Sequence, residues 1–329
     1  MQAITYKNTK TTIPGWIPTI HKEHERGLAY ETDTHFVHFY GRSSGLWVVS
    51  SGLTATEKKN GSLSDWAVRV FGAVDISPVR HPVGTAISGV WRPSLYYSNH
   101  ILQALGSSSN DLRSAEQSLR LLVDRLDELL LYIEPDTHGV NAYSHKTREL
   151  LILSCAELEN SWRHYMDLAN QLPMNGRSYT TQDYVKLLEP LFLSEFEIGL
   201  KPYGTISSMR PFKGWDSSNP TQSLTWYDSY NKTKHNRSAY FSDATLQNCF
   251  YSIAANLIMF CVRFGPFQLS QAPGTLTSLV LNLFNIELKD CDPKSFYVPQ
   301  IPTADLTENL ICFETRERIQ PWRSLSLQL

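Results

Sequence analysis

The chain has 329 residues, of which 42% are hydrophobic and 19% charged, and its formal net charge is −2. This composition excludes a disordered chain, and the length allows two domains or one large one with a core that needs no disulfide staples. The near-neutral charge argues against a protein coated in nucleic acid over its whole surface.

Targeting and redox signals are weak. The N-terminal segment has no apolar run typical of a signal peptide, and no apolar segment reaches the roughly 18 residues that span a bilayer. We therefore expect a cytoplasmic protein with no membrane partner. The five cysteines show no paired spacing, which predicts reduced thiols in the core: Cys155, Cys249, Cys261, Cys291 and Cys312.

The first hundred residues carry a strand pattern. Short stretches rich in β-branched and aromatic residues are separated by Gly, Ser and Pro, and Asn60-Gly61 is a turn signal between two of them. Residues 1–100 are therefore expected to form a small, mostly antiparallel sheet domain. The predicted strands are 35–40, 45–53, 65–76 and 83–91.

Two histidine pairs in this region have a spacing that invites a metal site. They are His21 with His24, and His35 with His38. On a strand, residues three apart point to opposite faces, which separates the second pair, and no cysteine or carboxylate set accompanies either pair. We expect no metal site, and nothing in the chain points to a cofactor.

Helical periodicity begins after residue 100. Asn110 is the predicted N-cap of a helix with an apolar stripe from Leu112 to Ile133, and a second stripe runs from Leu151 to Leu172. The short connection predicts an antiparallel helical hairpin. Residues 181–200 are expected to be helical with a break at Pro190.

A loop from 202 to 222 leads to the last predicted helical part, in which an apolar helix around 246–261 follows an expected N-cap at Ser242. Residues 101–265 are thus predicted to be a helical bundle. For 266–329 the pattern is too weak to choose between helix and strand. The predicted class is α+β.

A basic, aromatic stretch precedes the apolar helix. Between Lys201 and Phe241 six basic residues face two acidic ones, a segment charge of +4 that leaves −6 for the rest of the chain. Such a local positive patch can steer a phosphate-bearing partner. If the stretch is helical, Asn231 and His235 share one face. The basic residues are Lys201, Arg210, Lys213, Lys232, Lys234 and Arg237.

The helical hairpin, the shorter helices and the closing Asn-x-x-x-His resemble the HEPN superfamily of helical-bundle domains over about residues 110–265. The phrase Trp-Tyr-x-x-Tyr-Asn-Lys-x-Lys-His-x-Arg at 226–237 is also similar to one in uncharacterised bacterial proteins. The resemblance implies a metal-independent ribonuclease of a toxin or defence system that works as a homodimer. Asn231 matches the asparagine of the family motif and His235 its histidine, whereas Tyr230 stands where the motif has arginine.

Roles follow from the chemistry of RNA cleavage, which needs a base near neutral pKa and fixed cations for the phosphate. His235 is the expected base, Asn231 orients the histidine or the substrate, and Arg237 belongs to the catalytic set. The expected substrate-binding residues are Lys232, Lys234, Tyr230, Tyr227 and Trp226. Lysine is a poorer bidentate partner than arginine, so weaker or absent activity is expected.

Three alternatives stay open at this stage. The same surface fits a catalytically inactive module that binds RNA, a nucleotide or an operon-encoded protein partner, and the heptad-like helices fit a structural subunit that dimerises. In the third alternative the aromatic and basic residues only pack and solvate the bundle. Polar residues of the second long helix are candidate partners of the basic stretch: Glu157, Glu159, Asn160 and Arg163.

Overall fold

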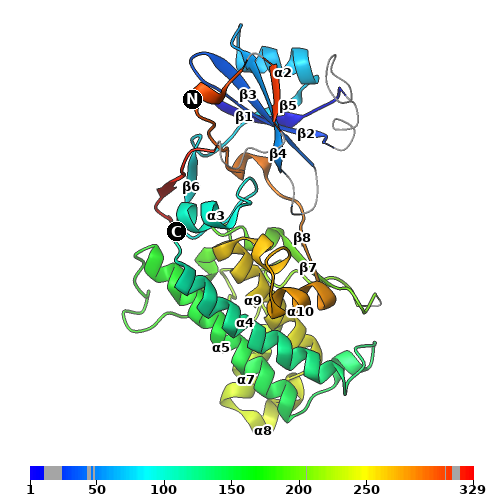
Figure 1. Cartoon of the computed structure of the whole chain (residues 1–329). Coiled ribbons are helices and arrows are strands. Elements are labelled where there is room, and N and C mark those ends of the chain that lie inside the picture. Colours follow the sequence, from blue (N-terminus) through cyan, green and yellow to red (C-terminus); the bar gives the residue numbers. More distant parts are fainter. Residues whose placement is uncertain (11–23, 43–45, 47–48, 205, 308, 313–318) are drawn as a thin grey trace. The chain divides into compact units, whose positions relative to one another are not determined.

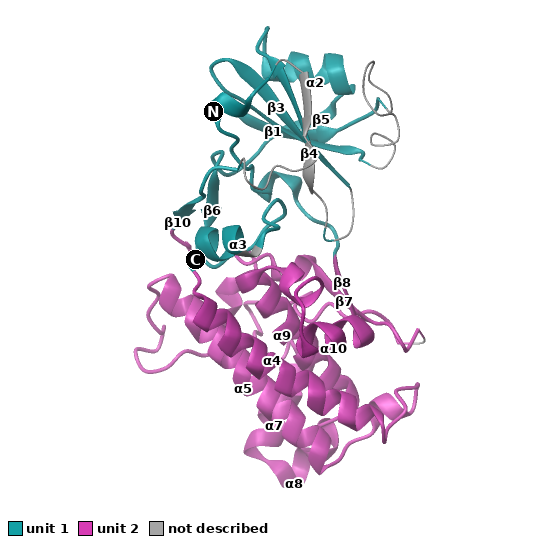
Figure 2. Cartoon of the chain, in the orientation of Figure 1, with its two compact units in different colours: residues 1–106, 288–325 teal, residues 107–287, 326–329 magenta. Residues whose placement is uncertain are grey.

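A computed structural model of the chain describes residues 1–10, 24–42, 46, 49–204, 206–307, 309–312 and 319–329. For residues 49–53, 98 and 309–312 it describes the backbone alone. The chain divides into two compact units, the first made of residues 1–106 and 288–325 and the second of residues 107–287 and 326–329 (Figure 2).

The first unit is built on an antiparallel sheet. In the described residues its strand order is β5-β1-β2-β3-β4-β9, so that a strand from the C-terminal part of the chain pairs with the edge of β4. The expected α+β class with an N-terminal antiparallel sheet is confirmed (Figure 1). The strands are β1 (Ala3–Lys7), β2 (Arg26–Glu31), β3 (His35–Gly41), β4 (Val49–Lys58), β5 (Val74–Pro78) and β9 (Asn309–Cys312).

A helix occupies part of the segment that was predicted as one long strand, 65–76. Residues Leu63–Phe71 form α2, and the strand β5 starts only at Val74. The N-cap Ser62 accepts a hydrogen bond from the Asp65 amide, and the buried residues fall at helical spacing on one face: Leu63, Trp66, Ala67 and Phe71. The strand prediction was wrong because it rested on aromatic and β-branched content, whereas the buried residues recur at helical rather than alternating spacing.

Other strand predictions fared unevenly. The prediction for 35–40 is confirmed by β3, while the prediction for 45–53 falls partly outside the described residues and overlaps β4 from Val49 onward. Of 83–91 only β6 (Thr85–Ile87) is a strand, and it pairs in parallel with β10 (Arg323–Leu325). The same unit also contains α3 (Ser98–Leu105).

His38 is a core residue of this sheet. It is fully buried, its Nδ1 lies 2.7 Å from the Tyr6 hydroxyl, and its ring stacks on Phe71 at 3.8 Å between centroids. Within the part of the chain that the structure describes, no group of three or more His, Cys, Asp or Glu side chains could hold a metal ion. His21 lies outside that part.

The second unit is a helical bundle. Four longer helices form its body: α4 (Ser109–Leu130), α5 (His145–Leu168), α7 (Thr225–His235) and α9 (Leu246–Phe264). It also holds the helices α6 (Thr181–Tyr184), α8 (Arg237–Tyr240) and α10 (Thr275–Leu283), and a two-stranded sheet of β7 (Phe196–Leu200) and β8 (Phe284–Leu288). The segment 266–329 is therefore divided between the units, with its helix in the second and β9 and β10 in the first.

Contacts at the helix ends give the directions. Arg125 near the end of α4 pairs with Glu149 near the start of α5 at 3.8 Å, so the predicted antiparallel hairpin is confirmed. The Arg148 guanidinium donates to the Thr233 carbonyl at 3.0 Å, which brings the start of α5 to the end of α7. The start of α5 and the end of α7 thus lie at the same end of the bundle (Figure 1).

The helix α9 is the centre of the unit. Residues 252–262 are all buried, as expected for a helix enclosed on every side. Its polar side chains bond to α5: the Ser154 and Ser252 hydroxyls lie 2.6 Å apart, and Asn256 Nδ2 donates to the Ser154 carbonyl at 2.9 Å. Three of the five cysteines are buried in the bundle, as predicted: Cys155, Cys249 and Cys261. Cys291 was also expected in the core but is only half-buried, and the side chain of Cys312 lies outside the described residues.

Helix ends differ from the sequence predictions by a few residues. The N-cap of α4 is Ser108 rather than Asn110, and the N-cap of α9 is Thr245 rather than Ser242. Leu172, expected on the stripe of α5, lies beyond that helix and is exposed. Only the start of the predicted helix 181–200 is helical, because α6 gives way to 3-10 turns around Pro190 and to β7.

No helix among the described residues combines the length and the apolar character needed to span a membrane.

The cap of α4 can be tested by a matched pair of variants. The Asp111 amide donates to Ser108 Oγ, and the Ser108 amide donates to the Asp111 carboxylate, each at 3.1 Å. Ser108→Ala should therefore lower the free energy of unfolding of the helical unit by about 1 kcal/mol. Urea titration followed by far-ultraviolet circular dichroism measures this. The exposed Asn110→Ala should change it by less than about 0.5 kcal/mol; an equal loss in both variants would contradict the assignment.

Candidate functional site

One face of α7 belongs to the core. Trp226, Tyr227, Tyr230 and Thr233 recur at helical spacing, and all four are buried. The Trp226 indole nitrogen donates to the Pro211 carbonyl at 3.1 Å. The three aromatic residues were expected to bind substrate, but the structure encloses them in the bundle, where bases cannot stack on them.

Tyr227 fixes this face of α7 to α5. Its hydroxyl donates to the Glu159 carboxylate at 2.7 Å, and its ring lies 5.2 Å from that of the buried Trp162. Burial, and then the negative charge of Glu159, raise the pKa of Tyr227 far above its usual value, so the phenol stays protonated and continues to donate. Of the four polar residues expected to face the basic stretch, Glu159 contacts it through this bond.

Asn231 and His235 lie on one side of α7. His235 is the last residue of the helix and is exposed, and Asn231, one turn earlier, is half-buried. Because residues four apart share a face, Asn231 and His235 point to the same side of the helix. Asn231 follows the buried Tyr227 by one turn and so lies at the border of the core face, while His235 is fully on the exposed side. The predicted pairing of this imidazole with this carboxamide on one exposed surface fits the helix geometry.

The lysines of α7 differ in their surroundings. Lys232 pairs with Asp228 at 2.6 Å one turn before it, so its charge is compensated locally. Lys234 donates to the Tyr230 hydroxyl at 2.8 Å, and that hydroxyl also bonds to the Glu159 carboxylate, so a negative charge lies close to the ammonium. Basic side chains in the last turn also complement the negative end of the helix dipole. The basic residues in the last turn of α7 therefore also stabilise the helix, apart from any role in binding.

Arg237 extends the surface onto α8. Its guanidinium lies 5.5 Å from the centroid of the Phe241 ring, and its Nη2 is 3.4 Å from His145 Nδ1. The His145 ring in turn lies 4.9 Å from that of Phe241. A second imidazole therefore stands beside the guanidinium that was expected to hold phosphate.

Sequence reasoning missed His145, which is 90 residues away from His235 in the chain. Its signal was the Ser144 cap: Ser144 Oγ accepts from the Thr147 amide, which makes His145 the first residue of α5. An antiparallel arrangement of α5 and α7 then brings that residue to the end of α7.

Exposed aromatic rings border these cations. Tyr143 is 51% exposed and contacts the Phe241 ring at 5.6 Å, and Tyr240 is 38% exposed with Lys232 Nζ 5.8 Å from its centroid. We name this surface the basic end of the bundle. It comprises Tyr143, His145, Asn231, Lys232, Lys234, His235, Arg237, Tyr240 and Phe241.

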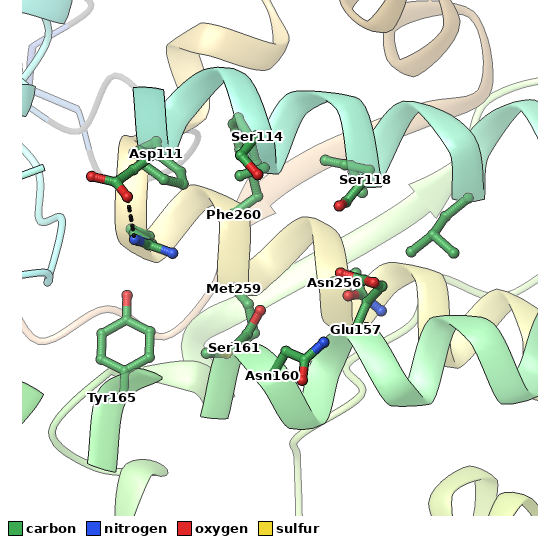
Figure 3. A pocket seen from close by; sticks show the side chains of 15 residues that line it. Asp111, Ser114, Ser118, Glu157, Asn160, Ser161, Tyr165, Asn256, Met259 and Phe260 are labelled. Carbon is green, nitrogen blue, oxygen red and sulfur yellow. Dashed lines mark ion pairs between the residues drawn. The ribbon is translucent and has the colours of Figure 1, made fainter. Parts of the chain in front are cut away.

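The chemistry available at the basic end is cationic and aromatic. The Arg237 guanidinium, which forms no ion pair with any residue that the structure describes, can attract phosphate, and the ring nitrogens of the two imidazoles can serve as hydrogen-bond partners. Of the other polar residues of α5 that were expected to face this surface, Glu157 and Asn160 line a separate pocket between α4, α5 and α9 (Figure 3), and Arg163 bonds to the Tyr184 side chain.

Comparison of the chain with protein-family models, with curated proteins and with solved structures found no match.

Proposed function

We propose that the helical unit binds single-stranded RNA at the basic end of the bundle. The observation that carries this proposal is the interleaving of aromatic rings with basic side chains, above all the exposed Tyr143 and the half-buried Phe241 beside His145 and Arg237. Single-stranded nucleic acids are held by basic side chains along the backbone and by aromatic side chains on which bases stack. In this proposal bases stack on the exposed Tyr143 and Tyr240, because Trp226 is buried.

Charge distribution supports the same proposal. Of the six basic residues between Lys201 and Phe241, Lys232, Lys234 and Arg237 lie at the basic end, whereas Lys201 and Arg210 donate to the carbonyls of Leu281 and Ser194 elsewhere in the unit. Three cations close together on one surface can attract a polyanion. Contacts of this kind release counterions from the nucleic acid, and binding must weaken as salt increases.

Arg237→Ala is the direct test. Anisotropy of a fluorescent single-stranded oligoribonucleotide with the full chain should show affinity reduced about tenfold. The slope of log affinity against log salt should fall by roughly 0.7, the value for one phosphate contact on a single strand. The matched control Arg177→Ala removes an exposed arginine from a loop of the same unit and should change neither quantity. Equal losses in the two variants, or binding independent of salt, would reject the proposal.

A second candidate, metal-independent RNA cleavage by a HEPN-like homodimer, is favoured by one arrangement. Asn231 and His235 share one side of α7, while Arg237 and His145 lie 3.4 Å apart at the same end. In this proposal His235 takes the 2′-hydroxyl proton, the 2′-oxygen bonds to phosphorus, and the P–O5′ bond breaks to leave a cyclic phosphate, while Arg237 holds the phosphate as charge develops on it. The leaving 5′-oxygen takes its proton from water. Tyr230, at the position of the missing motif arginine, is buried and cannot replace that cation.

Cleavage can be separated from binding with a histidine pair. Labelled single-stranded RNA and transfer RNA are incubated with the full chain in the presence of a chelator. His235→Ala should abolish the cut products and leave affinity within about threefold, since one side chain is lost from a many-contact surface. His164→Ala, near the other end of α5, should cleave like the parent. Cleavage products that persist equally in both variants would rule out this candidate. So would a parent chain that is dimeric but does not cleave RNA; RNA binding would then be the proposed function that remains.

A further inference from the structure

A polar pocket lies inside the helical unit, apart from the basic end. It has a volume of about 200 Å³ and is lined by α4, α5 and α9 (Figure 3). Most pockets between packed helices are apolar, because unpaired polar groups are costly there. Here amide, hydroxyl and carboxylate side chains line the walls, so the pocket is suited to a ligand with polar hydrogens.

Asn256 gives the pocket a fixed hydrogen-bond acceptor. Its side chain is only 8% exposed, and its Nδ2 donates to the backbone carbonyls of Ser154 at 2.9 Å and Ser252 at 2.8 Å. Both amide protons are thereby used, and the orientation of the carboxamide is set, since an amide turned the other way would place its oxygen against two carbonyls. No hydrogen bond from the described part of the chain reaches Oδ1, which is left for a donor in the pocket.

Glu157 adds an uncompensated negative charge. It lies on α5 one turn after Ser154, whose carbonyl holds Asn256, and it forms no ion pair or hydrogen bond with any residue that the structure describes. The other carboxylate, Asp111, is occupied: Ser108 donates to it and Arg263 lies 3.6 Å away. The lining therefore includes one carboxylate without a partner and one carbonyl oxygen without a donor among the described residues, and Figure 3 shows both residues toward the same end of the pocket.

The remaining lining decides the shape of the ligand. Figure 3 shows Asp111 and Tyr165 toward one end of the pocket and Ser118, Asn256 and Glu157 toward the other. Apolar side chains complete it: Leu119, Leu122, Met259 and Phe260. A ligand must present N–H donors at the Glu157 end and hydrocarbon against these apolar side chains, and the far end, with Asp111 and Tyr165, is polar again.

We infer that this pocket binds a small aliphatic primary amine, with the ammonium group against Glu157 and Asn256 Oδ1 and the methylene chain against the apolar lining. An alkylammonium is charged at neutral pH and offers three donors on a compact head, which matches a carboxylate next to a carbonyl. The inference uses different residues from the proposed RNA surface and does not depend on it.

Isothermal titration calorimetry on the full chain tests the inference with four probes of similar length. Pentylamine and cadaverine should bind saturably with one site per chain, whereas pentanol and pentanoate should not. A difference between the two amines reports whether a second ammonium is accepted at the far end; one of them must bind for the inference to stand. Saturable binding of pentanol as tight as that of pentylamine, or no saturable heat with either amine at millimolar concentration, overturns it.

Matched carboxamide variants locate the ammonium. Glu157→Gln keeps the size of the side chain and removes its charge, and it should weaken amine binding at least about tenfold. Glu149→Gln makes the same change two turns earlier on α5, outside the pocket, and should leave affinity within about twofold. Circular dichroism melting curves show whether both variants are folded. Equal weakening by the two substitutions would mean a general charge effect and would overturn the assignment.

Discussion

The side chain of Asn256 holds the helical unit in register. It bonds at once to its own helix and to the carbonyl of Ser154 on α5, within a seam that also contains the Ser154–Ser252 contact. A buried hydrogen bond contributes only about 1 kcal/mol net, but an unpaired buried amide costs more, so sliding one helix along the other is disfavoured. The seam thereby fixes α5, and α5 positions both the pocket and the face on which α7 packs.

The buried aromatic face of α7 packs against α5 and so determines which side chains of α7 are exposed. Because Trp226 and Tyr230 are enclosed and Tyr227 is bonded to Glu159, rotation of α7 about its axis is set. His235 is exposed as a consequence of that burial. Trp226, Tyr227 and Tyr230 were predicted to bind substrate. Instead they pack in the core and thereby orient α7, which carries the exposed polar side chains.

The sequence predicted the parts of the unit that depend on a long period. The apolar stripes of α4, α5 and α9 follow from spacing alone, and so does the shared face of Asn231 and His235. Exact caps did not follow, because Ser, Thr and Asn cluster near each helix start and tertiary packing selects among them. In the sheet unit, α2 was mistaken for a strand, and β1 and β2 were not recognised, since short strands carry few residues in which a period can show.

The components of the candidate sites that were missed are all non-local. His145 and Tyr143 reach the basic end only because α5 and α7 are antiparallel, and the pocket joins Glu157 to Asn256 from helices nearly one hundred residues apart. No local sequence pattern predicts that these residues of α5 lie near those of α7 or share a pocket with α9. By contrast, the burial of Tyr230 could have been argued from its place in the Trp226, Tyr227, Tyr230, Thr233 periodicity, which is the core face of an ordinary amphipathic helix.

Hydrogen–deuterium exchange of the full chain with and without single-stranded RNA tests the central claim, that the packing of α7 presents an RNA-binding surface, most directly. The account predicts slower exchange in peptides that cover residues 143–148 and 231–241 when RNA is present, with residues 3–7 and 26–41 of the sheet unchanged. Protection confined to the sheet strands, or no change at the end of α7 while RNA is demonstrably bound, would contradict it.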